Sequence, residues 1–501
     1  MERRYILSDP KDNVVTLLEN ASAGDVIKFA DSELVLLQDV PFAHKAAAAD
    51  IPKGASIFKY GERLGYALCD IKKGEWVHLH NLGCDTLDQG SYDPLAEKGT
   101  HGAAAENFAA AERTTFMGYR RPDGRVGVRN YVAIIPSVLC ADTASKMIAK
   151  QVPGCVALTH GVGCGQYGYD AEITARTLKA MGSHPNIYAA VVLGLGCERF
   201  QSSELYEAIK ASGKPVEHIV IQEEGDVFKT VEKGVAAARR FAKEASELKR
   251  EPCSISELII ATKCGGTDAT SGLAANPAVG SCCDRIVGQG GSGIISEVGE
   301  LLNTEHIFMR RADTPEVSEK IDRTFCDYRD YLREHCDPRY EKRNDLVTPG
   351  NEDGGVTNVV EKALGGVVKS GSSSFADVLE YATAPEDGKH GFFLMNYGNH
   401  DGEVVTGMIG CGAQICLFTT GRGTPTGFPF VPVIKITGNA ETFAKMRLNI
   451  DFDASPVISG EASVDELGGK LFEKLLAVAE GEQTVSEMLG ADELFCIARH
   501  S

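Results

Sequence analysis

A chain of 501 residues is too long for one hydrophobic core, because single cores stop growing at about 250–300 residues, so several domains are expected. Hydrophobic residues make up 43% and charged residues 24%, a mixture that excludes a disordered or fibrous protein. The formal net charge of −19 argues against binding to the phosphate backbone of nucleic acids. An acidic surface also repels anions, so a site for a carboxylate needs a metal ion, Arg, Lys or backbone N–H groups nearby.

The N-terminal sequence has no apolar segment of the kind found in signal peptides, and no run of about 18 apolar residues could span a membrane. We therefore expect a cytoplasmic protein that binds neither membranes nor nucleic acid. In a reducing compartment, the 15 cysteines are expected as thiols. Several stand beside Gly, His, Glu or Asp and are candidate metal ligands, although buried structural thiols are commoner.

Residues 1–82 predict a small all-β domain. Its short apolar runs are separated by Gly, Pro and Asp, and they occupy residues 14–20, 25–30, 34–40, 55–61, 63–71 and 75–81. The following segment, 83–113, is rich in Gly, Ala, Asp and Glu and is typical of an exposed linker.

This domain contains three histidines of interest. His44 and Lys45 follow a Pro-Phe-Ala turn and are candidate catalytic and substrate-binding groups. Alternation along a strand would place His78 and His80 on one face, as a metal site requires. Paired surface histidines are the commoner explanation.

From residue 131 onward, apolar runs alternate with helical stretches, which is typical of an α/β fold with parallel strands. Strands are expected at residues 131–138, 155–160, 188–195, 218–222, 258–262, 292–298, 391–396, 415–420 and 431–437. Helices are expected at 143–150, 230–248 and within the charged stretch 313–344. We divide this body into two Rossmann-like α/β domains, 114–345 and 346–501.

Unusual polar residues follow the ends of five of these apolar runs. Ligands of open α/β sheets bind beyond the carboxyl ends of the strands, so the five ends predict one composite site. In chain order, the candidates are His160, Cys164 and Gln166; Cys197 and Glu198; Lys263, Cys264 and Asp268; Glu297; and Thr420, Arg422 and Thr424.

Each group also has a purely structural explanation: a strand-to-helix turn at His160, a buried thiol beside a helix-capping acid at Cys197, or a capped glycine turn at Asp268. The segment 419–425 combines hydroxyls, a fork-shaped cation and flexible backbone, which suit a carboxylate with vicinal hydroxyls. It lacks the spacing of a phosphate-binding loop, and no strand is followed by GxGxxG.

Many of these blocks occur together in one family. The chain resembles the altronate/galactarate dehydratases through GYRRPDGRVGVRNYVAIIPSV, THGVGCGQYGYD, VVLGLGCE, KCGGTDATSGLAANPAVG, SEVGE, NVVEKALGGVVKSG, TTGRGTPTG and DFDAS. The N-terminal block from His44 to Asn81 is similar to the family's small β-clip domain, shared with antifreeze-like and flagellar-assembly proteins.

The resemblance implies a lyase that removes water from a sugar acid to give a 2-keto-3-deoxy product, assisted by Fe²⁺ or another divalent cation such as Mn²⁺. Sulfolactate sulfo-lyases belong to the same family, often with the two parts on separate chains, so a fused chain favours a dehydratase. EWVHLHN favours altronate, whereas GNHDGEVVTGMIGCGAQ and GTPTGFPFVPV are partly galactarate-like and leave the substrate open. A homo-oligomer is expected.

For this chemistry we expect His160 or His44, with Lys263 as a further catalytic candidate, to transfer protons. Lys45, Gln166, Asp268, Thr420, Arg422 and Thr424 are the candidate substrate contacts. The pool of metal ligands is Cys164, Cys197, Glu198, Cys264, His78 and His80, and Cys164, Cys197 and Cys264 could alternatively hold an iron–sulfur cluster. The small domain is expected to cover the site as a lid.

Overall fold

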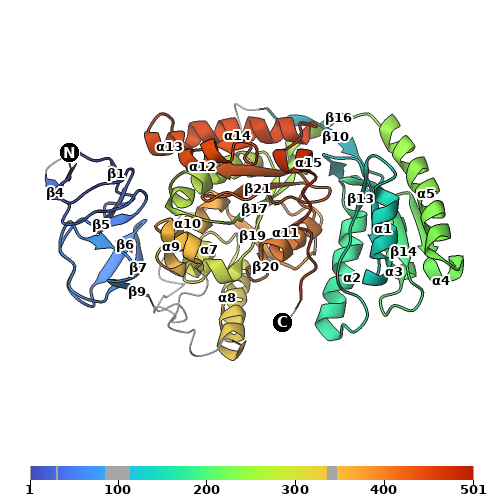
Figure 1. Ribbon diagram of the computed structural model, residues 1–501, viewed down its shortest axis with the longest axis horizontal. Helices are drawn as coiled ribbons and strands as arrows, with labels where there is room; N and C mark the ends of the chain where they lie inside the picture. Colours follow the sequence, from blue (N-terminus) through green and yellow to red (C-terminus); the bar gives the residue numbers. More distant parts are fainter. Residues whose placement is uncertain (1, 30–31, 85–112, 336–346, 500–501) are drawn as a thin grey trace.

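The computed structural model describes residues 2–29, 32–84, 113–335 and 347–499. Three parts follow one another along its long axis: the N-terminal β domain, a large α/β unit in the middle and a smaller α/β unit at the far end (Figure 1). The expected linker falls almost wholly outside the described residues. Within the described ranges, no helix is both long and apolar enough to cross a membrane.

The N-terminal domain is built from short antiparallel strands, as its sequence predicts. Its four-stranded sheet has the order β1 (Tyr5–Ile6), β2 (Val14–Leu17), β5 (Lys45–Ala47), β8 (Trp76–Val77). A three-stranded sheet contains β6 (Ser56–Lys59), β7 (Glu62–Ala67) and β9 (Leu82–Gly83), and β3 (Val26–Lys28) pairs with β4 (Glu33–Val35).

The strand expected at 75–81 is much shorter than predicted. It ends at Val77, and His78 and His80 lie in the turn that follows. The side chain of Asn81 closes this turn by accepting from the backbone N–H of His78 at 2.9 Å and donating to the carbonyl of Trp76 at 2.9 Å. His78 and His80 thus lie outside the regular strand. The prediction that strand alternation places both imidazoles on one face was therefore wrong.

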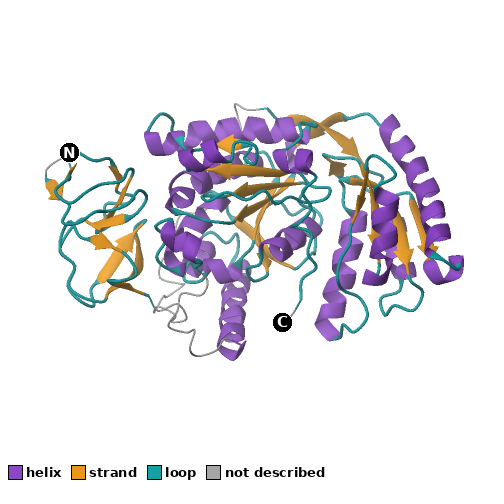
Figure 2. Ribbon diagram, in the orientation of Figure 1, coloured by secondary structure: helices purple, strands orange, loops and turns teal. Residues whose placement is uncertain are grey.

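The smaller α/β unit contains a parallel sheet of order β13 (Cys155–Ala157), β12 (Tyr131–Pro136), β14 (Ile187–Gly194), β15 (Val216–Val220). Its helices are α1 (Asp142–Ala149), α2 (Gly168–Ser183), α3 (Ser202–Ala211), α4 (Ile221–Glu224) and α5 (Val227–Glu247). They flank the strands (Figure 2). An antiparallel sheet of β11 (Val126–Gly127), β10 (Thr115–Arg120) and β16 (Glu251–Ser254) joins the entry of this unit to its exit.

The large unit contains one parallel sheet of seven strands. Their order is β19 (Phe375–Glu380), β20 (Gly391–Asn396), β18 (Ser292–Ile295), β17 (Ile259–Cys264), β21 (Ile415–Thr419), β22 (Val433–Thr437), β23 (Phe452–Asp453). The helices include α6 (Asn276–Val287), α7 (Glu305–Arg310), α8 (Pro315–His335), α9 (Pro349–Asp353), α10 (Val359–Val367), α11 (Asp401–Gly410), α12 (Ala440–Lys445), α13 (Pro456–Ser459), α14 (Val464–Ala479) and α15 (Val485–Leu489).

Strands from both sides of residue 345 belong to this one sheet, so the division expected there does not separate two sheets. The change of sheet lies between α5 and β17 instead. Apolar strand sequences look alike whichever sheet they join, and only the pairing partners distinguish them.

The centre of the large sheet is a topological switch point. From β17 the chain moves to β18 on one side and returns later to β21 on the other. Open α/β sheets bind ligands at such a switch point, beyond the carboxyl ends of the central strands, here β17 and β21.

The N-terminal domain is attached to the large unit by buried charges. Glu361 of α10 accepts from Lys45 Nζ at 2.8 Å and from Lys59 Nζ at 2.7 Å, and all three side chains are buried. Burial alone would raise the pKa of Glu361, but the two ammonium groups outweigh it and hold this pKa well below 4.5. The ion pairs thus form only when the domain docks on α10.

Replacing Glu361 with Gln should release the domain. Removing one partner of a buried ion pair costs about 3–5 kcal/mol, because the other charges remain buried and unpaired. Trp76 is the only tryptophan and donates to His44 Nδ1 at 3.2 Å next to the domain contact, so its fluorescence reports docking. In urea titrations, the fluorescence transition of E361Q should move to lower urea, well ahead of the loss of far-ultraviolet circular dichroism.

Glu62→Gln is the matched control. Glu62 also crosses the contact, to His306 and Arg310, but is partly exposed, so its loss should cost below about 1 kcal/mol. Because the folded-state pKa of Glu361 is depressed, its stabilisation is fully present above pH 4.5 and disappears as the pH falls below that value. Equal midpoints for E361Q and E62Q would contradict this role for Glu361.

Candidate active site

The five strand ends that were expected to form one site belong to two sheets. The groups after β17, β18 and β21 lie at the carboxyl edge of the large sheet, and those after β13 and β14 lie at the edge of the small sheet. The N-terminal domain and the small sheet are on opposite sides of the large sheet (Figure 1). The five strand ends therefore do not share one sheet edge, as the single composite site had assumed.

A buried charged cluster forms the floor of the large-sheet edge. Lys263, in β17, forms ion pairs with Glu297 and, at 2.7 Å, with Asp401. Lys369 donates to Glu297 at 3.1 Å and to the sulfur of Cys264 at 2.9 Å. Lys263, Glu297 and Lys369 are each no more than 1% exposed, so these charges depend on one another.

The backbone and electrostatics of this cluster are unusual. Glu297 follows β18 with φ of 76°, a left-handed conformation that a non-glycine residue rarely adopts and that often accompanies functional sites. Burial disfavours the ammonium of Lys263, yet Glu297 and Asp401 raise its pKa well above 10.5. Burial likewise opposes ionisation of Glu297, yet Lys263 and Lys369 lower its pKa. Both groups are therefore charged at neutral pH.

Two loops lie over this floor. Arg422 N–H and Gly421 N–H donate to the carbonyl of Gly266 at 2.9 and 3.1 Å, which joins the loop after β21 to the loop after β17. Thr420 Oγ accepts from Gly423 N–H at 2.9 Å and is buried, whereas Arg422 is exposed. The structure thus brings the predicted substrate contacts Thr420 and Arg422 together with Lys263.

Asp268 and Thr424 have mainly local partners. Asp268 is buried and accepts from Thr270 Oγ1 at 2.6 Å and from Asn439 Nδ2 at 2.9 Å. Thr424 Oγ1 lies 3.1 Å from Thr426 Oγ1. Asp268 orders the loop and borders a small cavity between the two domains, whose lining includes Thr267, with its buried hydroxyl unpaired, and Lys59 and Tyr60 of the N-terminal domain.

His44 and His78 of the N-terminal domain contact α9, which adjoins Asp268. His44 Nδ1 accepts from Trp76 Nε1, so its Nε2 carries the proton and donates to the carbonyl of Asp353 at 3.3 Å. His78 Nε2 bonds to the carbonyl of Glu352 at 3.2 Å and stacks on His44 with ring centroids 5.0 Å apart. Burial, then nearby Lys45 and His44, lower the pKa of His78 to about 4.

These contacts place the N-terminal domain over the edge of the large sheet to which Asp268 belongs. Burial also lowers the pKa of His44, so both rings are neutral at neutral pH. His80 is exposed and packs beside Trp76, with ring centroids 5.5 Å apart. Lys45 is fully buried in its ion pair with Glu361, so the structure gives this candidate substrate contact a role in domain docking.

The edge of the small sheet holds the remaining candidates. His160 donates from Nε2 to the carbonyl of Pro136 at 2.9 Å, and burial lowers its pKa. Gln166 accepts from Thr174 Oγ1 at 3.0 Å. Glu198 is buried and accepts from Ser137 Oγ at 2.8 Å, whereas Cys164 and Cys197 are exposed. His160 and Glu198 thus have structural partners at this edge.

The expected pool of metal ligands is divided among three places: the N-terminal domain, the large-sheet edge and the small-sheet edge. Among the described residues, two other groups bring three ligand atoms within 4.8 Å of one another. One is Cys264, Glu297 and Glu300. Three ammonium groups contact it, because Lys362 pairs with Glu300 at 3.1 Å in addition to Lys263 and Lys369, so a cation there would face positive charge.

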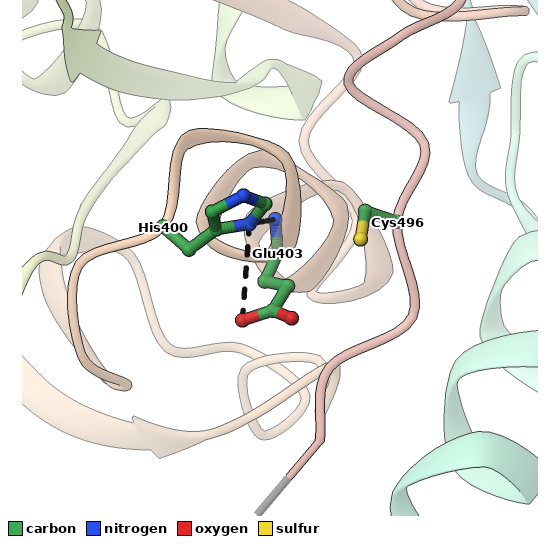
Figure 3. Close-up of side chains that lie close together, drawn as sticks. All are labelled: His400, Glu403 and Cys496. Atoms are coloured by element: carbon green, nitrogen blue, oxygen red, sulfur yellow. Dashed lines mark hydrogen bonds and ion pairs between the residues drawn. The ribbon is translucent and has the colours of Figure 1, made fainter. Parts of the chain in front are cut away.

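The other group is His400, Glu403 and Cys496 (Figure 3), where Arg499 acts on the Cys496 thiol but no ammonium group pairs with the Glu403 carboxylate among the described residues. His400 and Glu403 lie at the start of α11, and Cys496 comes from the C-terminal segment. Tyr397 donates to Glu403 Oε2 at 2.7 Å and thereby orients the carboxylate. Imidazole, carboxylate and thiolate suit Fe²⁺ or Zn²⁺. Asp401 is the residue after His400 and forms an ion pair with Lys263, so it connects this group with the buried charged cluster.

Sequence reasoning missed Lys369, Glu300 and Asp401. A signal was present for Lys369, because it directly follows the apolar run 363–368, where a charge is costly unless it is paired. Glu300 lies in the same short motif as Glu297, three residues further along. Asp401 had no local signal, since its partner Lys263 is far away in sequence.

Comparison with known proteins agrees with this division into three parts. Family models described as the altronate/galactarate dehydratase SAF domain, the D-galactarate dehydratase/altronate hydrolase second domain and the D-galactarate/altronate dehydratase C-terminal domain match residues 3–85, 118–246 and 255–501.

Three relatives extend this comparison to whole chains. Altronate dehydratase of Escherichia coli is 34% identical over 97% of both chains, and galactarate dehydratase (L-threo-forming) of the same organism is 34% identical over 97% of this chain and 95% of its own. The (2R)-sulfolactate sulfo-lyase subunit beta of Chromohalobacter salexigens is 38% identical over 76% of this chain and 96% of its own. The resemblance first seen in the motifs is confirmed: the chain belongs to the altronate/galactarate dehydratase family.

Proposed function

We propose that this protein is a hydro-lyase that dehydrates a sugar acid, altronate in the first place, to a 2-keto-3-deoxy acid. The observation that carries the proposal is the bonding of the loop with Thr420 and Arg422 to Gly266, which lies three residues beyond the buried Lys263 of the Lys263–Glu297 pair, at the switch point of the large sheet. The end-to-end similarity to an altronate dehydratase supports the same function.

The chemistry requires stabilisation of negative charge. Removing the proton next to a carboxylate builds an enediolate, and departure of the β-hydroxyl adds further charge. Arg422 has an exposed guanidinium at the loop junction and binds the substrate carboxylate; Thr420 shapes the loop beneath it. The ammonium of Lys263 stabilises the developing charge from the floor of the site, where a low dielectric strengthens its effect.

A divalent cation, Fe²⁺ or Mn²⁺, is part of the proposal and would be held by His400, Glu403 and Cys496. When bound, such an ion supplies Lewis-acid stabilisation of the carboxylate and a neighbouring hydroxyl. His44 and His78 lie across α9 from Asp268, so the docked N-terminal domain excludes water from this side of the site. We assign no proton transfer to His160, since it lies at the other sheet and both its ring nitrogens are bonded.

Incubation of the purified protein with aldonates and aldarates in the presence of Fe²⁺ or Mn²⁺ tests the function. Altronate should yield a 2-keto-3-deoxy acid, detected by its carbonyl chemistry and mass. Preferential turnover of galactarate would instead make the chain a galactarate dehydratase of the same family. Release of sulfite from sulfolactate would make the chain a sulfo-lyase, and thermal stabilisation by sugar acids without turnover would make it a binding protein.

Arg422→Gln should lower kcat/KM about 10–100-fold, which corresponds to the ~1.5–3 kcal/mol of a hydrogen bond to a charged group. The loss should appear mainly in KM if Arg422 binds the carboxylate equally in the ground and transition states. Arg447→Gln is the matched control, since Arg447 is an exposed arginine that packs on Phe443. Unchanged kinetics of R422Q would remove this residue from the site.

Removal of divalent cations with a chelator should abolish turnover, and Fe²⁺ or Mn²⁺ should restore it. Glu403→Gln should raise the metal concentration needed for half-maximal reactivation at least about tenfold, because a charged ligand is lost. The metal retained after dialysis, measured by atomic emission, should fall in parallel. Glu441→Gln, at the start of another helix, is the control. Full turnover of the metal-free protein would refute the role of the cation.

A further inference from the structure

Three cysteines at the carboxyl edge of the small sheet are exposed to solvent. Cys140, Cys164 and Cys197 are exposed, whereas Cys253, Cys264, Cys282, Cys283, Cys411 and Cys416 are buried. Cys140 follows β12, Cys164 follows β13 and Cys197 follows β14. These three strands are neighbours in one parallel sheet, in the spatial order β13, β12, β14. Parallel neighbours end at the same edge, so the loops that carry the three thiols emerge side by side.

Hydrogen bonds hold these loops against one another. Leu139 N–H, beside Cys140, donates to the carbonyl of Val162, two residues before Cys164, at 3.0 Å. Glu198, beside Cys197, accepts from Ser137 Oγ at 2.8 Å, three residues before Cys140. A side chain at Gly163 would lie 2.6 Å from Val138, so glycine is needed for this close approach.

The surroundings leave room for a large anionic group. Around Cys164, a Cβ atom at Gly161, Gly165 or Gly168 would meet nothing within 4 Å. Helices α1, α2 and α3 begin two, four and five residues after the three cysteines, so their N-termini face this edge and favour thiolates. Gln222 Nε2 donates to the sulfur of Cys197 at 3.6 Å, as donors around metal-bound sulfur do.

We propose that Cys140, Cys164 and Cys197 bind a four-iron iron–sulfur cluster. The alternative of one metal ion is disfavoured, because these thiols are not among the groups of described residues whose ligand atoms lie within 4.8 Å of one another. Cluster thiolates stand farther apart, since each binds a different iron. Cys264 is no ligand of this cluster, because it lies at the other sheet with Lys369 bonded to its sulfur.

Three protein thiolates leave one iron of a four-iron cluster without a protein ligand. That iron is open to an oxygen ligand, such as a hydroxyl or carboxylate of a small molecule. The cluster goes beyond the proposed dehydration, which rests on residues of the large sheet, and its presence can be measured without any turnover.

The test uses the full-length protein, purified without air and reconstituted with iron, sulfide and a thiol reductant. Wild type should contain about four iron and four acid-labile sulfide per chain, with a broad sulfur-to-iron absorption band in the visible range. Cys140→Ser, Cys164→Ser and Cys197→Ser should each lose most of the sulfide and the band. Because these residues are exposed, their thermal unfolding should match that of wild type.

Cys69→Ser, which removes an exposed cysteine of the N-terminal domain, is the matched control and should keep the cluster. Wild type without labile sulfide would overturn the proposal, and so would iron bound without sulfide, which would indicate a single-ion site. Equal cluster content in C69S and C164S would also overturn it. A protein that carries the cluster but dehydrates no sugar acid would refute the proposed function alone.

Discussion

The ion pairs of Glu361 with Lys45 and Lys59 determine where the N-terminal domain lies. One carboxylate forms ion pairs with two ammonium groups, and all three side chains are buried. Such an arrangement is costly to assemble, because three charged groups leave water, and removing one partner from the docked state is costlier still, because it leaves a buried charge unpaired. The positions of His44, His78 and the cavity beside Asp268 all follow from this contact.

A second buried set of charges lies beneath the proposed site. Three lysines, Lys263, Lys369 and Lys362, pair there with three carboxylates, Glu297, Glu300 and Asp401, so the charges of the cluster balance one another. The exposed guanidinium of Arg422 then supplies the positive charge that a site for an anionic substrate needs in a strongly acidic protein. The left-handed backbone of Glu297 shows that the fold accepts local strain to hold this carboxylate between two lysines.

Residue types at strand ends were a good guide to chemistry and a poor guide to proximity. Lys263, Thr420 and Arg422 were correctly placed at one edge, because β17 and β21 are neighbours. His160, Cys197 and Glu198 carry the same kind of signal, yet their strands pair in another sheet. Likewise, Lys45 resembled a substrate contact in sequence but is buried against Glu361, a partner more than 300 residues away.

The sequence by itself determined the family, the β-rich start, most of the strands and the polar residues beyond their ends. These features depend on local periodicity, on turn residues and on contiguous motifs. Only the tertiary structure decided which strand ends meet, which lysines are paired and which cysteines share an edge. Those outcomes depend on strand order and on contacts between residues far apart in the chain, and local sequence carries little information about either.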